Sequence, residues 1–147
     1  MNSRQTTGAK TYRVKDVAAI AGVSVRTLHH YDELGLLVPE RTRAGYRVYT
    51  TDDLLRLQQI LLGKELGLSL DEVQQSLDDP EFDRRGALME QRKELERRRQ
   101  NTEKMIHAID AALAMLDQSS TDGKDMKDLF DGFDPKQYEK EAEDRWG

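Results

Sequence analysis

Residues 84–117 leave the chain little choice of local structure. This stretch of 34 residues is dense in charged side chains, contains no proline and has one glycine. Residues without charge recur in it at every seventh position: Leu88, Leu95, Thr102, Ile109 and Leu116. Such a heptad repeat is typical of a coiled-coil helix. The helix would be roughly 50 Å long at about 1.5 Å per residue. Nothing else in the chain could cover it along that length, so we expect a partner helix from a second copy.

The expected dimer seam is polar in its first half and apolar in its second. The complementary heptad positions are Gln91, Arg98, Met105 and Ala112, and Ile106 and Leu113 widen the apolar half. We therefore assign dimerisation to Leu88, Leu95, Thr102, Met105, Ile106, Ile109, Ala112, Leu113 and Leu116. The alternative is a single solvated helix whose repeat is accidental.

The charge of the chain is divided unevenly. The net charge is −5, yet residues 1–50 contain eight Lys and Arg against four Asp and Glu. The remaining 97 residues contain fifteen basic and twenty-four acidic residues. A basic amino-terminal module attached to an acidic remainder is a common electrostatic pattern in proteins that bind nucleic acid.

Several other classes of protein fit the sequence poorly. There is no cysteine, so disulfides and thiolate metal sites are excluded, and three histidines give no metal-ligand spacing. No apolar run is long enough to cross a bilayer, and residues 1–10 lack the apolar core of a secretory signal. We find no paired nucleophile and base and no glycine-rich phosphate loop. We therefore expect a cytoplasmic protein that is not an enzyme and uses neither a metal nor another cofactor.

Two short helices joined by a tight turn are predicted between residues 14 and 34. Gly22 interrupts the first helical pattern, and Ser24 is a suitable N-cap for a second helix that runs to about Leu34. The side chains expected to face the first helix are Leu28, Tyr31 and Leu34, and those expected to face outward are Arg26, His29, His30 and Glu33. This arrangement is the signature of a helix-turn-helix.

The pattern after residue 39 predicts a small β-hairpin, or wing, and two more helices. Residues 46–49 alternate with β-favouring side chains after a turn at Ala44-Gly45. Thr51 is expected to cap a third helix that Gly63 and Gly67 break. Ser69 and Glu72 form a capping box for a fourth helix that ends near Leu77. The expected fold class is mainly α: a winged helix-turn-helix of four helices and a hairpin, followed by the long helix.

The composition divides the chain into five parts. We expect a disordered arm at 1–11, a winged domain at 12–80, the dimerisation helix at 81–118 and a polar linker at 119–128. Residues 129–147 are an acidic tail with clustered aromatic and apolar side chains: Leu129, Phe130, Phe133, Tyr138 and Trp146. Such a cluster needs something to pack against.

The winged domain resembles the MerR family of bacterial transcriptional regulators. The resemblance rests on VSVRTLHHYDELGLL at 23–37, GYRVY at 45–49, DLLRLQ at 53–58, KELG at 64–67 and LDEV at 70–73. It implies a winged helix-turn-helix dimer joined by an antiparallel coiled coil. The pair His29-His30 is similar to the multidrug- and thiopeptide-responsive, TipA/Mta-like branch of the family. Residues 129–147 resemble the opening of the antibiotic-recognition (TipAS) domain of that branch, whose bulk we expect to lie beyond this sequence.

A winged helix-turn-helix places its second helix in the major groove of DNA. Arg26 is the strongest candidate for a base or phosphate contact, because its guanidinium can bind guanine or phosphate through two nitrogens. The alternative for Arg26 is a surface salt bridge to Asp32 or Glu33, and the alternative for the two histidines is solvent exposure. The expected DNA-contacting residues are Val25, Arg26, Thr27, His29, His30, Tyr31, Arg41, Arg43, Gly45, Tyr46, Arg47 and Lys64. Tyr31 is expected to be partly core, Tyr49 is a core rather than a contact residue, and Lys64 is placed in a loop resembling a second wing.

The resemblance implies a homodimeric activator that binds promoter DNA and distorts an over-long promoter spacer, so that RNA polymerase holoenzyme can engage it in the nucleoid of a bacterial cell. A drug-like ligand would act through the remainder of the recognition domain. Two alternatives belong to other classes. One is an antibiotic-sequestering protein, although the aromatic tail alone is expected to be too short for a pocket. The other is an architectural winged-helix DNA binder.

Overall fold

The computed structural model describes residues 10–117 and 126–146, without the side chain of Trp146. Most of the expected arm at 1–11 and of the linker at 119–128 therefore lies outside the described residues. The chain divides into two compact units, Met1–Asp83 and Arg84–Gly147. The first unit is built around one apolar core of nine buried residues: Val17, Leu28, Tyr31, Leu36, Leu37, Tyr49, Leu57, Ile60 and Val73.

The helix-turn-helix is confirmed. Helix α2 (Val14–Ala21) ends at Gly22, whose φ of 74° is the left-handed conformation that favours glycine. Helix α3 (Val25–Glu33) begins after Ser24, and the Ser24 hydroxyl accepts a hydrogen bond from the Thr27 amide at 3.0 Å. Leu34 departs from the expectation. It follows the end of α3 and is 44% exposed, so it does not pack against α2 as its spacing suggested.

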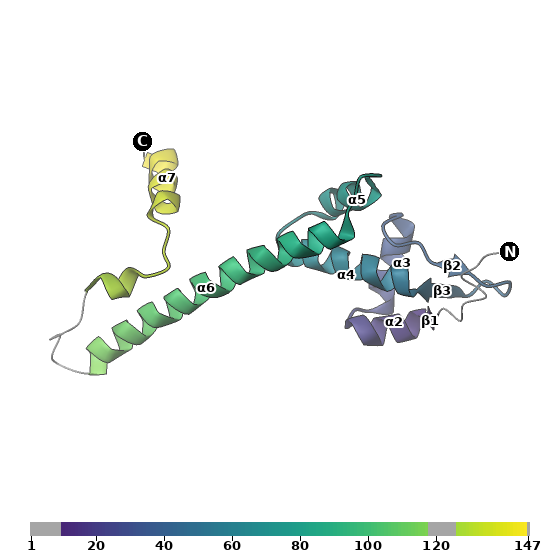
Figure 1. Ribbon diagram of the computed structural model, residues 1–147, viewed down its shortest axis with the longest axis horizontal. Coiled ribbons are helices and arrows are strands. Elements are labelled where there is room, and N and C mark those ends of the chain that lie inside the picture. The colour runs from purple at the N-terminus through teal and green to yellow at the C-terminus, as the bar shows by residue number, and fades with distance from the viewer. Residues whose placement is uncertain (1–9, 118–125, 147) are drawn as a thin grey trace. The chain divides into compact units, whose positions relative to one another are not determined.

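The wing is confirmed and has one strand more than the sequence indicated. Strands β2 (Glu40–Arg41) and β3 (Arg47–Thr50) form the expected antiparallel hairpin. Strand β1 (Thr11–Arg13) pairs with the other edge of β3, so the order of the sheet is β1-β3-β2 (Figure 1). Thr11, which the sequence placed in the arm, therefore belongs to the sheet.

The third helix, α4 (Thr51–Glu65), corrects two expectations. Its N-cap is Thr50 rather than Thr51, and the side chains of Thr50 and Asp53 each bond the backbone amide of the other. Gly63 was expected to break the helix, but it is a buried residue within α4, which continues to Glu65. A Cβ at Gly63 would be 2.6 Å from Cγ2 of Val73, so this glycine allows helix α5 (Leu70–Asp78) to approach closely. The Ser69–Glu72 capping box at the start of α5 is confirmed.

The second unit contains the expected long helix, α6 (Arg84–Asp117), which is one uninterrupted helix of 34 residues (Figure 1). It is followed by the short 3-10 helix η1 (Met126–Phe130) and by α7 (Pro135–Trp146). Residues 126–128 thus belong to a helix and not to the expected linker. Gly132, at φ 90°, fits against α6: a Cβ there would be 2.9 Å from Cγ of Met105 and 3.1 Å from the carbonyl oxygen of Asn101.

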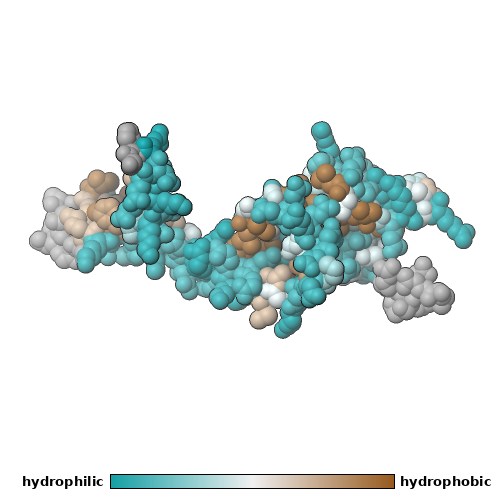
Figure 2. All heavy atoms as spheres, turned by 90° about the horizontal axis from the view of Figure 1, so that it is seen from above, coloured by the Kyte–Doolittle hydropathy of each residue, from teal (hydrophilic) through white to brown (hydrophobic). Residues whose placement is uncertain are grey.

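Hydrophilic side chains cover most of the visible face in the space-filling view, and apolar side chains form separate patches (Figure 2). Among residues 10–117 and 126–146, no helix combines the length and the apolar character that crossing a membrane would require.

Candidate nucleic-acid interface

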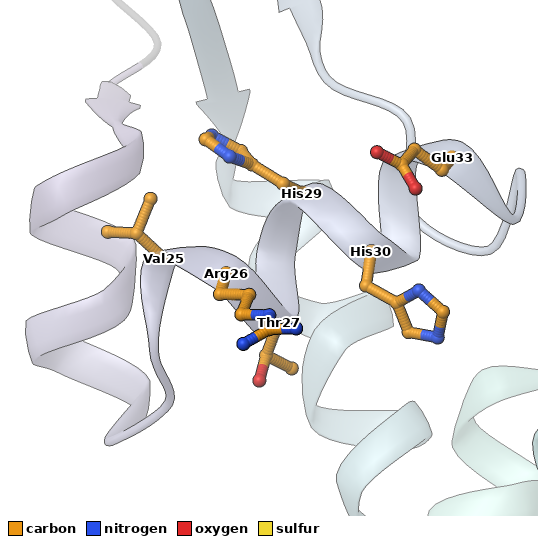
Figure 3. A pocket seen from close by; sticks show the side chains of 6 residues that line it. All are labelled: Val25, Arg26, Thr27, His29, His30 and Glu33. Carbon is orange, nitrogen blue, oxygen red and sulfur yellow. The ribbon is translucent and has the colours of Figure 1, made fainter.

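The outward face of α3 forms an open hollow in the first unit. Val25, Arg26, Thr27, His29, His30 and Glu33 line a volume of about 800 Å³ (Figure 3). Leu28, on the opposite side of the helix, is fully buried in the core. The side of α3 that the sequence assigned to a partner is therefore the side that the fold leaves open.

Arg26 is the exposed cation of this hollow. It forms no ion pair with any residue that the structure describes. The alternative of a salt bridge to Asp32 is not realised, because the Asp32 carboxylate binds two other arginines. A guanidinium without an internal partner keeps all five of its N–H donors for an external acceptor, such as a phosphate oxygen or a guanine edge.

Tyr31 is a residue of α3 that packs into the apolar core. Only 8% of it is exposed, and burial raises the pKa of its phenol above the ordinary value. It is thus mainly a core residue, and a contact from its remaining exposed edge to DNA stays a prediction. Tyr49 is fully buried, as expected, and burial raises the pKa of its phenol as well.

Two of the predicted wing contacts, Arg41 and Arg47, are bound to α3 instead of being free. Arg47 Nε donates to Oδ2 of Asp32 at 2.9 Å, and Arg41 Nη2 lies 3.7 Å from the same oxygen. Arg41 also donates from Nη1 to the carbonyl oxygen of Gly45 at 3.1 Å. Gly45 adopts a φ of 89° in the turn of the wing. These contacts join the strands, the turn and α3.

The tip of the wing presents different groups. Arg43 is exposed and has no ion pair among the described residues. Tyr46 is 58% exposed, and the guanidinium carbon of Arg13 lies 4.7 Å from the centre of its ring. This cation–π contact adds Arg13 to the candidate interface. Sequence reasoning missed Arg13, although it stands between two lysines, Lys10 and Lys15, in the basic first third of the chain.

Lys64 is exposed, as a DNA-contacting residue must be, but its location differs from the expectation. It lies in the last turn of α4 and not in the loop that follows. A lysine at this place is favourable for the helix, since the carboxyl end of a helix carries partial negative charge.

Arg56 of α4 holds the segment that follows α3. Its Nε donates to the carbonyl oxygen of Leu36 at 2.7 Å, and its Nη2 donates to Oδ1 of Asp78 at 2.9 Å. Gln74 Nε2 adds a bond to the carbonyl oxygen of Leu34 at 3.3 Å. Helices α4 and α5 thus hold the chain just beyond α3, a role for Arg56 and Gln74 that no pattern in the sequence indicated.

Helix α6 presents two different faces, and the predicted dimer seam is not confined to one of them. One face is exposed and apolar, with Leu95 at 42%, Ile106 at 52%, Ile109 at 59%, Leu113 at 51% and Leu116 at 82%. The other face contacts η1 and its following turn and includes the buried Ala108 and Ala111. Met105 adjoins Gly132 of its own chain, and Ala112 is half-buried. Of the remaining predicted seam residues, Leu88 is half-buried and Thr102 is exposed.

The aromatic tail forms an open apolar hollow of about 720 Å³. Its lining consists of Leu129, Phe130, Phe133, Pro135, Tyr138 and Glu139. The tail was expected to be too short to make a pocket; η1 and α7 line a hollow there, but it is open to solvent and not an enclosed pocket. Within the described residues there is no group of three or more His, Cys, Asp or Glu side chains that could hold a metal ion.

Comparison with known proteins identifies the fold and the family. The model of the family "MerR HTH family regulatory protein" matches residues 12–79, and "MerR, DNA binding" matches residues 54–119. The transcriptional activator Mta of Bacillus subtilis is 50% identical over 129 residues, which are 87% of this chain and 49% of Mta. The transcriptional activator TipA of Streptomyces coelicolor is 48% identical over 139 residues, which are 93% of this chain and 55% of TipA. The chain thus spans about half the length of these curated relatives.

The solved structure of the transcriptional regulator SkgA from Caulobacter crescentus gives a TM-score of 0.79 at 44% identity. The match covers 91% of this chain and 96% of the SkgA chain. It therefore includes both units and not the winged module alone. The winged module with its open α3, the long helix and these matches together show that the chain belongs to the MerR family of DNA-binding helix-turn-helix transcriptional regulators.

Proposed function

We propose that this chain acts as a homodimer on double-stranded promoter DNA and activates transcription. The observation that carries the proposal is the open face of α3, where Arg26 lines the hollow with His29 and His30 and has no ion pair to any described residue. Arg26 binds a base edge or a phosphate in the major groove, and the exposed Arg43 and Lys64 bind flanking phosphates. The names of Mta and TipA as transcriptional activators support the direction of the effect.

Dimerisation occurs through the exposed apolar face of α6. Its side chains Ile106, Ile109, Leu113 and Leu116 are apolar and uncovered in the single chain, which favours burial against a second α6. Two winged modules then read two half-sites, and the antiparallel pairing expected of the family sets their spacing. Analytical ultracentrifugation should show a dimer, and Ile109→Asp should shift it to monomer. An unchanged dimer in that variant would place the seam elsewhere.

Activation follows from distortion of the DNA rather than from added chemistry. The bound dimer bends and untwists an over-long promoter spacer, and its contacts offset the deformation energy of the duplex. RNA polymerase holoenzyme then engages both promoter elements. In vitro transcription from a promoter with a lengthened spacer should be stimulated by the chain, and shortening the spacer to ordinary length should abolish the stimulation. An architectural DNA binder would bind both templates without a difference in transcription.

DNA binding itself is tested by fluorescence anisotropy. The probe is a duplex of about 30 base pairs selected from a randomised pool by the wild-type chain. Arg26→Ala should weaken binding by about 1–3 kcal/mol and relax sequence preference, because one good bidentate contact has that value. Unchanged affinity would exclude α3 as the recognition helix. Leu55→Ala, which shortens an exposed side chain of α4 outside the predicted contacts, is the control and should bind DNA as the wild type does. Both variants should keep the wild-type circular dichroism.

A second candidate function is supported by the hollow of the tail. Phe130, Phe133 and Tyr138 offer an apolar aromatic surface that suits a drug-like or thiopeptide ligand. Ligand binding would act on the regulator through a shift in its conformational equilibrium, or it would sequester the antibiotic. Isothermal titration with a thiopeptide tests the binding itself. Repeating the anisotropy and transcription assays with the thiopeptide present should separate the two roles: sequestration leaves DNA affinity and transcript level unchanged, whereas regulation alters one of them.

A further inference from the structure

The carboxylate of Asp32 joins α3 to the wing. Asp32 is the penultimate residue of α3, and its side chain is 17% exposed. An aspartate is unfavourable there on two counts. It adds negative charge to the carboxyl end of a helix, and it stands on an element proposed to approach phosphates. Its presence needs another explanation.

That explanation is the pairing of the wing. Arg41 and Arg47 are direct partners in the β2–β3 ladder. Like charges placed directly opposite each other destabilise an antiparallel pair. The Asp32 carboxylate lies 2.9 Å from Arg47 Nε and 3.7 Å from Arg41 Nη2, so it is the counter-charge for both.

The contacts of this carboxylate continue into the turn of the hairpin. Arg41 extends the contact to the turn through its bond to the Gly45 carbonyl oxygen. Within the turn, the amide of Thr42 donates to the carbonyl oxygen of Tyr46 at 2.9 Å, and the amide of Tyr46 donates to the Thr42 hydroxyl at 3.1 Å. These bonds close the turn, and Asp32 connects it to α3 through Arg41.

We propose that Asp32 is a positioning residue for DNA binding: it holds the wing at the angle to α3 at which Arg43 reaches the phosphates beside the major groove that α3 occupies. The inference rests on the proposed DNA binding. It makes a prediction opposite to that of simple electrostatics. If Asp32 affected DNA only through its charge, its removal would strengthen binding to every duplex. If it positions the wing, its removal weakens binding to the selected duplex.

The test compares Asp32→Asn with Glu65→Gln, which removes the same charge from the exposed carboxyl end of another helix, α4, outside the α3 hollow and the wing. With the selected 30-base-pair duplex, Asp32→Asn should bind about tenfold more weakly and Glu65→Gln as tightly as wild type or more so. With a scrambled duplex, Asp32→Asn should lose little, so its ratio of specific to non-specific affinity falls. Asp32→Glu, which keeps the carboxylate, should recover part of the loss.

A double-mutant cycle excludes a merely structural role. Arg43→Ala should weaken binding several-fold in the wild-type background and have almost no effect in the Asp32→Asn background, because the misdirected wing no longer reaches the DNA. Equal effects of Arg43→Ala in the two backgrounds, or tighter binding by Asp32→Asn, would overturn the proposal. If the wild-type chain selects no duplex, or Arg26→Ala binds normally, the proposed function itself fails; failure confined to the Asp32 variants leaves it standing.

Discussion

Gly63 provides a sharp test of how the winged unit is held together. Gly63 lies in the last turn of α4, where replacing it with alanine should by itself stabilise the helix by at most about 1 kcal/mol. The Cβ would however lie 2.6 Å from Cγ2 of Val73, a residue that is only 3% exposed. Overpacking of this kind costs typically about 1–3 kcal/mol. The clash should exceed the gain in propensity, and we expect Gly63→Ala to reduce the free energy of unfolding by about 1 kcal/mol.

The assay is urea unfolding at fixed chain concentration, followed by near-ultraviolet circular dichroism of the buried Tyr31 and Tyr49. Val73→Ala alone should cost about 2 kcal/mol through lost burial and the resulting cavity. In that background the clash is gone, so adding Gly63→Ala should now stabilise by at most about 1 kcal/mol. The sign of the alanine effect therefore reverses between the two backgrounds. A rise in stability from Gly63→Ala alone, or the same effect in both backgrounds, would refute the reasoning.

Three further perturbations test other local features. Ser24→Ala removes the acceptor of the Thr27 amide and should cost about 1 kcal/mol in the same urea assay, whereas Ser24→Asn should restore most of it. Hydrogen bonds from Arg97 and Arg98 lower the pKa of Glu94 to about 2, so a carboxyl-carbon NMR titration should find its midpoint near that value and Arg97→Gln should raise it. Because the folded pKa of Glu94 is lowered, the stabilisation of α6 by these bonds is complete above the ordinary pKa of glutamate and is lost as the pH falls toward 2. A midpoint near the ordinary glutamate pKa would show that solvent screens the interaction of Glu94 with the two arginines. Gly132→Ala places a Cβ 3.1 Å from the Asn101 carbonyl oxygen at a φ of 90°, so amide exchange in residues 126–133 should accelerate about tenfold, and unchanged protection there would contradict the described fit.

Most features that depend on near neighbours in the sequence were predicted correctly. The Ser24 cap and the Ser69–Glu72 capping box each follow from residues within a few positions of one another, whereas the N-cap of α4 was predicted one residue late, at Thr51 instead of Thr50. Tyr49 could be placed in the core because alternation along β3 gives one inward side.

Features that depend on distant neighbours were missed. Glycine has a low helix propensity, so Gly63 was predicted to end the helix. Only the close approach of Val73, which leaves no room for a Cβ, explains why a glycine lies inside α4. Strand β1 has three residues and no pattern of its own, so its pairing with β3 could not be inferred. Asp32 and Arg47 are fifteen positions apart, and local reasoning treated the arginine as free for DNA. The heptad likewise could not reveal that Met105 faces the chain's own Gly132.

The ion pairs of Asp32 have a consequence for counterion release. Each phosphate that a free cation neutralises expels condensed ions from DNA, and the logarithm of affinity falls with the logarithm of salt concentration by about 0.9 per contact. Arg41 and Arg47 already share a carboxylate in the protein, so their approach to DNA displaces fewer ions than their formal charge implies. The number of ions released per protomer should therefore be smaller than the eight basic residues of the first fifty positions suggest. Binding that depends less on displaced ions keeps more of its strength as salt rises, and this leaves sequence readout by α3 a larger share of the total.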